Sequence, residues 1–191
     1  MQETYFQDKT FNRIDFIQNP LPKGEYENCV FNNCIFADGN LSEFVFIDCR
    51  FERCNLSLTK LDKATLRDIK FKDCKMLGLR FDTCNAFGIS FSFEGCQLNH
   101  SSFYKTRIRN TVFINCDLQE TDFTDADLAN AVFDKCNLSK AIFENTVLEK
   151  ADFRTSYNYA IDPEINRVKR ARFSIFGIAG LLQKYDIDIE Q

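Results

Sequence analysis

Large apolar side chains recur at every fifth residue along most of this chain. The series runs from Phe6 to Phe91 and, after a slip of two residues, resumes at Leu98 and continues to Phe153. Nearly all of these central positions are Phe or Leu. A helix repeats every 3.6 residues and a strand every two, so a period of five fits neither element alone. The pattern therefore predicts a backbone that turns a corner every five residues and points each central side chain at a common axis.

Small residues occupy a second slot, two positions before each central residue, and most of them are Cys, Ala, Ser or Thr. The other three positions of each pentad are mostly charged or polar. We therefore expect a narrow square coil, with one large and one small residue of each pentad inside and three residues in water. All nine cysteines fall in the small slot, at Cys29, Cys34, Cys49, Cys54, Cys74, Cys84, Cys96, Cys116 and Cys136.

Two pentads show a family resemblance most clearly. Residues 126–130 (Ala-Asp-Leu-Ala-Asn) and 151–155 (Ala-Asp-Phe-Arg-Thr) look like the A(D/N)LXX and A(D/N)FXX units of pentapeptide-repeat proteins. The resemblance covers residues 24–157 approximately and implies an all-β fold, a right-handed quadrilateral β-helix with four pentads in each coil. Coils stack like parallel strands, about 4.8 Å apart, so the regular body should hold roughly seven coils.

We interpret the chain as one domain with three parts. Residues 1–22 are expected to cap the N-terminal end, because two prolines interrupt the ladder there. Residues 23–160 form the β-helix, with the slip placed near residues 92–95. Residues 161–191 form a C-terminal turn, a short helix and a dimerisation module. Caps at both ends are expected because each coil of a solenoid contacts only its neighbours.

The C-terminal segment departs from the repeat where the central position is the polar Asn158. Ser174 is expected to cap a short helix from Ile175 to about Tyr185, and the alternation at 186–190 predicts a short strand. The helix is apolar nearly all round, so it needs partners on two sides. One face would close the coil and the other would meet a second copy, with a purely intramolecular cap as the alternative. The expected dimer contacts are Phe176, Ile178, Leu181 and Leu182.

The cysteine spacing favours a structural role. Cys96, Cys116 and Cys136 lie twenty residues apart and so stack on one wall; the set beginning at Cys34 does likewise. Stacked side chains stay near the strand spacing, which exceeds the separation that a disulfide needs. Since His100 is the only histidine and adjacent slots lie on different walls, we expect no metal and no cofactor. The thiols would act as small buried hydrophobic groups.

Composition restricts the functional classes further. The net charge is −4 with an isoelectric point near 5.1, which argues against nucleic-acid binding through a basic surface. The chain has no apolar run of transmembrane length, and its start does not resemble a signal peptide, so a cytoplasmic protein is expected. We find no catalytic triad, no phosphate-binding glycine loop and no metal-spaced histidine pair, and therefore predict that it is not an enzyme.

Charge is segregated along the rod. Basic residues prevail between Lys60 and Arg80, and acidic residues prevail between Asp117 and Phe153. Stacked residues of opposite charge could pair, as at Lys105–Asp125, Arg107–Asp127, Glu120–Lys140 and Asp134–Arg154. Five carboxylates have no such partner inside the regular body and are the candidates for binding a partner, the alternative being that they only keep the protein soluble: Asp117, Asp122, Glu144, Glu149 and Asp152.

Three segments resemble a subgroup of the family, the Qnr-like fluoroquinolone-resistance proteins. They are residues 84–91 (Cys-Asn-Ala-Phe-Gly-Ile-Ser-Phe), the Ile-Asp-Pro turn at 161–163, and Leu181-Leu182. The resemblance implies a homodimer that binds DNA gyrase or topoisomerase IV as a DNA mimic and protects it from quinolones. The chain departs from that subgroup in having no long insertion and in its basic band. The alternative is a protein–protein interaction scaffold with an unknown partner.

Overall fold

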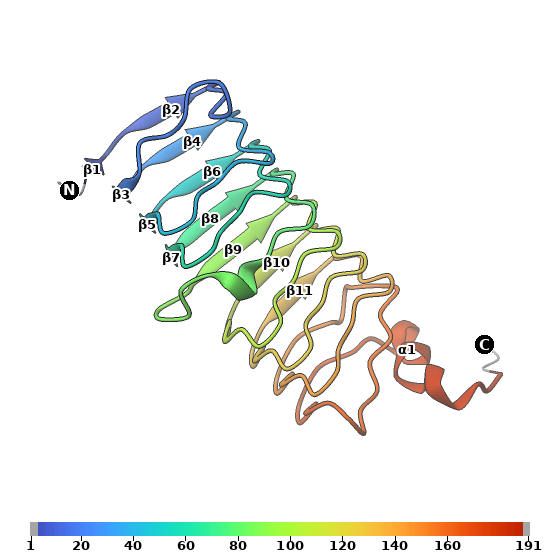
Figure 1. Cartoon of the computed structure of the whole chain (residues 1–191). Coiled ribbons are helices and arrows are strands. Elements are labelled where there is room, and N and C mark those ends of the chain that lie inside the picture. The colour runs from blue at the N-terminus through green and yellow to red at the C-terminus, as the bar shows by residue number, and fades with distance from the viewer. Residues whose placement is uncertain (1–3, 189–191) are drawn as a thin grey trace.

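Residues twenty positions apart lie side by side in parallel register through most of the chain, so four pentads make one coil. In this computed structural model, which describes residues 4–188, the coils stack into an elongated rod (Figure 1). The rod is the predicted quadrilateral β-helix, with one short helix at its C-terminal end. No helix within the described residues is long and apolar enough to cross a membrane.

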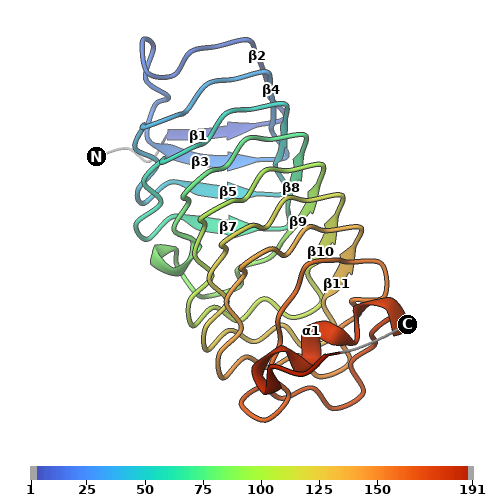
Figure 2. The ribbon, with the colours of Figure 1, turned by 90° about the vertical axis from the view of Figure 1, so that its right-hand side faces the viewer.

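Two of the four walls contain regular strands, and the other two are joined by isolated bridges (Figure 2). One sheet has seven parallel strands in the order β11-β10-β9-β8-β6-β4-β2, and the other has the order β1-β3-β5-β7. The strands are β1 (Thr4–Gln7), β2 (Thr10–Asn12), β3 (Gly24–Glu27), β4 (Val30–Asn32), β5 (Val45–Ile47), β6 (Arg50–Glu52), β7 (Thr65–Arg67), β8 (Ile69–Lys72), β9 (Phe91–Glu94), β10 (Val112–Ile114) and β11 (Val132–Asp134).

A single stack of phenylalanine rings fills the inner side of the seven-stranded sheet, which we name the phenylalanine wall. Successive ring centroids are 4.6–5.3 Å apart and the rings are nearly parallel. Stacked aromatic pairs contribute about 0.5–1.5 kcal/mol each beyond the area they bury. The core is thus continuous along the rod. The stack consists of Phe11, Phe31, Phe51, Phe71, Phe93, Phe113, Phe133, Phe153 and Phe173.

The small slot accommodates hydrogen-bond donors as well as small volumes. The hydroxyl of Thr121 donates to the Leu98 carbonyl at 3.0 Å, and Thr146 donates to the Phe123 carbonyl at 2.9 Å. Each of these acceptors belongs to the central residue of a preceding coil. A buried hydroxyl without a partner would destabilise the fold by about 1–3 kcal/mol, so this contact explains why Ser and Thr are tolerated inside.

Six cysteines form one uninterrupted row on the wall that follows the phenylalanine wall along the chain, which we name the cysteine wall. The two groups predicted from the twenty-residue spacing are one group, because the bridges Lys75–Gln97 and Gln97–Asp117 continue the register across the slip. All the thiols are buried and free. The row consists of Cys34, Cys54, Cys74, Cys96, Cys116 and Cys136.

The corners of the coil use a left-handed backbone. The residue two positions after almost every central residue has a positive φ, between 51° and 71° along the coils, and only three of these residues are glycines. Asn and Asp, which tolerate this conformation, occupy many of the corners, but Leu58 adopts it as well. A period of five therefore results from a three-residue arm and a two-residue corner, whose first residue is left-handed.

The position predicted for the slip was wrong. Phe71 pairs with Phe93, and Ile69 pairs with Phe91, so residues 92–94 are in regular strand register. The two additional residues lie earlier, in the loop formed by residues 84–90, which follows a 3₁₀ turn at Phe81–Thr83. Ala86, counted as a central residue, is exposed. The count of five had continued only because Ala86 and Phe91 are apolar.

Both ends of the rod continue the coil. At the N-terminus, β1 and β2 pair with β3 and β4, so residues 4–22 form the first coil. At the other end, the bridges Val147–Arg167 and Asp152–Arg172 extend the register beyond Asn158.

The expected C-terminal helix is divided into a 3₁₀ turn (Ile175–Gly177), α1 (Ala179–Leu182) and a second 3₁₀ turn (Gln183–Tyr185). Ser174 caps the first turn as predicted, accepting a hydrogen bond from the Gly177 amide. Residues 186–188 are not in a strand, and the rest of the strand predicted at 186–190 lies outside the described residues.

Candidate protein-binding surface

Asp117 lies on the cysteine wall and is already engaged by neighbouring coils. Its carboxylate accepts hydrogen bonds from the side-chain amides of Asn99 at 2.8 Å and Asn137 at 3.0 Å. It is half-buried and also accepts a bond from the Gln119 amide. These contacts hold the stacked coils together, so Asp117 is less available to a partner than the sequence suggested.

Asp122 and Glu144 lie on a different wall, which follows the cysteine wall along the chain and which we name the acidic wall. Bridges join Ser102, Asp122 and Ile142, so this wall places Glu144 one coil beyond Asp122. Asp125 stands between them, and its amide donates to the Glu144 carbonyl at 2.8 Å. Within the described residues none of these three carboxylates forms an ion pair, which leaves a negatively charged surface there.

Two of the predicted carboxylates are neutralised. Asp152 pairs with Arg154 at 2.7 Å and with Arg172 at 3.7 Å, and Glu149 pairs with Arg167 at 2.7 Å. The prediction considered only stacked partners inside the regular body and assumed that the register ends at Asn158. The register persists beyond that residue, and Arg154 also reaches back along its own pentad. The guanidinium of Arg154 holds the pKa of Asp152 below its ordinary value.

The pairs expected from twenty-residue stacking are found only in part. Glu120 contacts Lys140 at 3.7 Å, as predicted, and also contacts the ring of His100. Asp127 pairs with Arg109 rather than with Arg107. Lys105–Asp125 and Asp134–Arg154 are not among the ion pairs of the described residues; Asp134 instead accepts a hydrogen bond from Thr155 at 2.7 Å.

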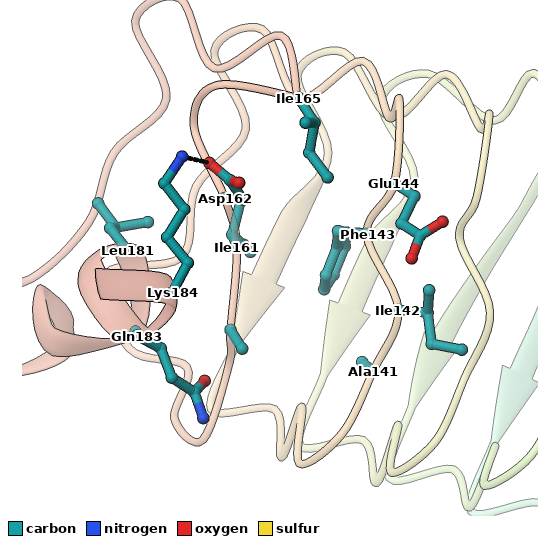
Figure 3. A pocket seen from close by; sticks show the side chains of 12 residues that line it. Ala141, Ile142, Phe143, Glu144, Ile161, Asp162, Ile165, Leu181, Gln183 and Lys184 are labelled. Atoms are coloured by element: carbon teal, nitrogen blue, oxygen red, sulfur yellow. Dashed lines mark ion pairs between the residues drawn. The ribbon is translucent and has the colours of Figure 1, made fainter. Parts of the chain in front are cut away.

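A groove of about 380 Å³ lies at the C-terminal end of the acidic wall, between the last coils and α1 (Figure 3). Ile142 and Ile165, which are 43% and 48% exposed, supply much of its apolar lining, and the Glu144 carboxylate stands beside them (Figure 3). Lys184 pairs with Asp162 at 2.9 Å and lowers the pKa of that carboxyl. The groove could not be predicted from the sequence, because it forms where α1 folds back onto the coil.

The basic residues form a belt instead of a patch. Four successive pentads, one on each wall, contain Lys60, Lys63, Arg67, Lys70 and Lys75, so these residues encircle the rod. None of the five forms an ion pair within the described residues. In the same coils, however, Lys72 pairs with Glu94 and Arg80 with Asp82. The belt crosses the acidic wall at Lys60 and Lys63, so Asp122, Asp125 and Glu144 lie in the coils on its C-terminal side.

A short loop projects from the rod beside the belt, where the two additional residues are accommodated (Figure 1). Phe87 in this loop is 75% exposed, and the guanidinium of Arg67 lies 5.4 Å from the centroid of its ring. This loop holds only two additional residues, and they are enough to expose an aromatic side chain.

The expected dimer contacts divide into two classes. Phe176 is 91% exposed and Ile178 is 43% exposed, and neighbouring Ile175 is also exposed. Leu181 packs against the core of the last coil, and Leu182 is half-buried. The segment thus closes the coil with one side and presents Phe176 and Ile178 to solvent with the other.

Two of the buried thiols are held in the protonated form. Burial raises the pKa of the Cys49 and Cys84 thiols to about 12, so both are protonated at neutral pH. Within residues 4–188 no group of three or more His, Cys, Asp or Glu side chains is arranged to hold a metal ion.

Comparison with known proteins identifies the family of this chain and a solved structure with a similar fold. Residues 24–92 and 89–157 match the family model for the pentapeptide repeat region. Full-length QnrB1, a plasmid-mediated fluoroquinolone resistance protein, is 15% identical, with a TM-score of 0.57 over 96% of this chain and 100% of QnrB1. HetL, a pentapeptide repeat protein involved in heterocyst differentiation regulation from the cyanobacterium Nostoc sp. Strain PCC 7120, is 13% identical, with a TM-score of 0.44 over 89% of this chain and 87% of HetL. No curated protein sequence matches this chain.

Proposed function

Because this chain belongs to the pentapeptide repeat family, whose model matches residues 24–157, we propose that it is a non-catalytic protein that binds DNA gyrase or topoisomerase IV through its acidic wall. Bound in the place of DNA, it would protect the enzyme from quinolones. The fold it shares with QnrB1, a fluoroquinolone resistance protein, supports this choice of partner.

The observation that supports the proposal most strongly is that Asp122, Asp125 and Glu144 share one wall and form no ion pair with any residue from 4 to 188. An enzyme surface that holds DNA is basic, and complementary charge speeds and orients the encounter of two proteins. The wall is regular, because the coil spacing of about 4.8 Å fixes how far apart its carboxylates lie. A regular acidic surface is what a positively charged DNA channel can accept.

The test is a gyrase supercoiling titration with the purified protein, with and without ciprofloxacin. The protein should restore supercoiling in the presence of the drug. Asp122→Asn/Glu144→Gln removes two charges with little change in shape, since Asn can still accept the hydrogen bond that Asp122 accepts from the Thr124 amide at 2.9 Å. We expect this variant to need roughly tenfold more protein, which corresponds to about 1.4 kcal/mol.

The matched control is Asp38→Asn/Asp48→Asn, which changes the net charge equally in the N-terminal coils. Both positions have a positive φ, which Asn tolerates. This control should behave like the unmodified protein. Equal loss in both double variants would show that net charge matters and the acidic wall does not, and no protection by any form at micromolar concentration would overturn the proposal.

The basic belt favours the alternative, a scaffold for a different protein. Five cations without ion pairs within the described residues encircle the rod, and an acidic partner could bind them. In that case Lys60→Gln/Lys63→Gln should weaken capture of the partner, while Asp122→Asn/Glu144→Gln should leave it unchanged.

We also propose that two copies associate tail to tail through Phe176 and Ile178. A phenylalanine that is 91% exposed leaves a large apolar surface in water, and a second copy would cover it. Such a dimer would join two acidic walls into a longer negatively charged surface.

A further inference from the structure

Eight of the nine cysteines belong to stacked rows. Six form the row on the cysteine wall from Cys34 to Cys136. The other two, Cys29 and Cys49, are stacked on the phenylalanine wall, because the strands that directly follow them, β4 and β6, pair in register. Cys84, which lies in the loop of residues 84–90, has no stacked cysteine neighbour. The chain therefore contains both paired and solitary buried thiols.

The eight stacked thiols share one conformation. Each sulfur lies 3.3–3.5 Å from the carbonyl oxygen of the residue two positions earlier in the chain. Cys84 makes no such contact among the hydrogen bonds of the described residues. Because identical side chains in identical conformations repeat with the coil, neighbouring Sγ atoms are separated by about the coil spacing, roughly 4.8 Å.

That separation matches the span of two metal–sulfur bonds. A metal–thiolate bond measures roughly 2.3 Å, so two bonds in a straight line span about 4.6 Å. Zinc prefers four ligands in a tetrahedron, which a single row does not supply. We propose that adjacent cysteines of the rows bind a soft, two-coordinate divalent cation such as Hg²⁺, one ion between each pair of coils that it joins.

Charge balance favours a divalent ion in this interior. Two S–H bonds break, two metal–sulfur bonds form, and two protons leave to solvent. Two thiolates and one divalent cation are neutral together, so no net charge is buried among the apolar side chains. A monovalent cation bound to two thiolates would leave one negative charge in the core. A disulfide is not an alternative in the folded rod, because its sulfurs must approach to about 2.05 Å.

Four ions per chain are expected when each thiol binds one ion. The pairs are 29/49 on the phenylalanine wall and three successive pairs in the six-membered row. A bound ion joins two coils that otherwise meet only through hydrogen bonds and packing, and it binds the folded chain in preference to the unfolded one. Binding of this kind raises the melting temperature.

The test uses the full chain, reduced and equilibrated with HgCl₂ in the presence of β-mercaptoethanol as a competing thiol. Native mass spectrometry counts the ions, and thermal denaturation measures stability. The unmodified protein should retain four ions and melt about 5 °C or more higher. Cys54→Ser/Cys116→Ser should retain two ions, because it leaves only one adjacent pair in the six-membered row.

Serine is a mild replacement here, since Ser156 continues the same row and its hydroxyl donates to the Phe133 carbonyl at 2.7 Å. The matched control is Cys84→Ser, which removes a buried thiol outside the rows and should retain four ions. Equal loss of ions in Cys84→Ser and in the row variant would overturn the proposal. A fall in melting temperature on adding Hg²⁺ would also overturn it, because the ion would then bind the unfolded chain.

Discussion

The guanidinium of Arg154 forms a bidentate ion pair with the carboxylate of Asp152. Nε donates to Oδ1 at 2.9 Å, and the terminal nitrogen donates to Oδ2 at 2.7 Å. Arg172, stacked one coil beyond, approaches the same carboxylate at 3.7 Å. The pair lies on the phenylalanine wall, which the cysteine wall separates from the acidic wall, and it neutralises the charge of Asp152.

This pair should make stability depend on pH. The pKa of Asp152 is lowered in the folded chain, chiefly by the hydrogen bonds from Arg154, so its contribution is present above the unfolded pKa and is lost as pH falls through the folded value. Asp152→Asn should cost about 0.5 kcal/mol at neutral pH, and the cost should vanish in acid below that range. Urea denaturation at pH 7 and at pH 2–3 measures the difference. If the cost is unchanged in an Arg154→Gln background, the pair is not its source.

The register of the coil can be tested with two adjacent substitutions. Phe123 is fully buried, between Phe103 and Phe143 at 5.2 and 5.1 Å, so Phe123→Asp should prevent folding by burying an unpaired charge. Thr124→Asp lies one residue later on the outer side and should fold normally. Circular dichroism of the two purified variants distinguishes them, and similar stability would contradict the register.

One corner offers a gain in stability. Leu58 has a φ of 57° and is 60% exposed, so it adopts a left-handed conformation that disfavours its side chain by about 1–2 kcal/mol. Leu58→Asn should stabilise the protein by about 0.5–1 kcal/mol, since Asn tolerates this backbone. Leu77→Asn, one coil away on the same wall but without a positive φ, is the control and should bring no gain in chemical denaturation.

The proposed dimer depends on a single prominent side chain. Phe176→Glu should convert the dimer to a monomer in analytical ultracentrifugation, because it places a charge in the apolar contact. Phe87→Glu is the matched control, since Phe87 is similarly exposed at the projecting loop far from the C-terminal end. A protein that is monomeric without any substitution would refute the tail-to-tail association.

The interior could be predicted from the sequence because its rule is short: each pentad supplies one large and one small residue. The phenylalanine stack and the buried cysteines follow from that rule alone. The slip was misplaced because residue type cannot separate Phe91 in the small slot from Phe93 in the central slot; only strand pairing shows which one continues Phe71.

The surface was less predictable than the core. Glu149 and Asp152 were expected to be free, yet their partners Arg167 and Arg172 lie in a coil whose residues no longer follow the apolar pattern. The groove beside Glu144 forms where α1 returns to the coil, a contact between segments that no repeat encodes. No ion pair of the described residues involves Asp122 or Glu144, and their part in binding a partner stays a prediction.

The loop at residues 84–90 is a local insertion whose distortion is confined to one wall of the rod. The coils on either side of the loop are in regular register, because Phe71 pairs with Phe93 and Phe93 pairs with Phe113. The number of residues at this point is therefore not tied to multiples of five. A foreign peptide inserted next to Phe87, between Ala86 and Gly88, would lengthen this projecting loop and leave the stacked coils unchanged. The rod could therefore serve as a rigid scaffold that displays an epitope.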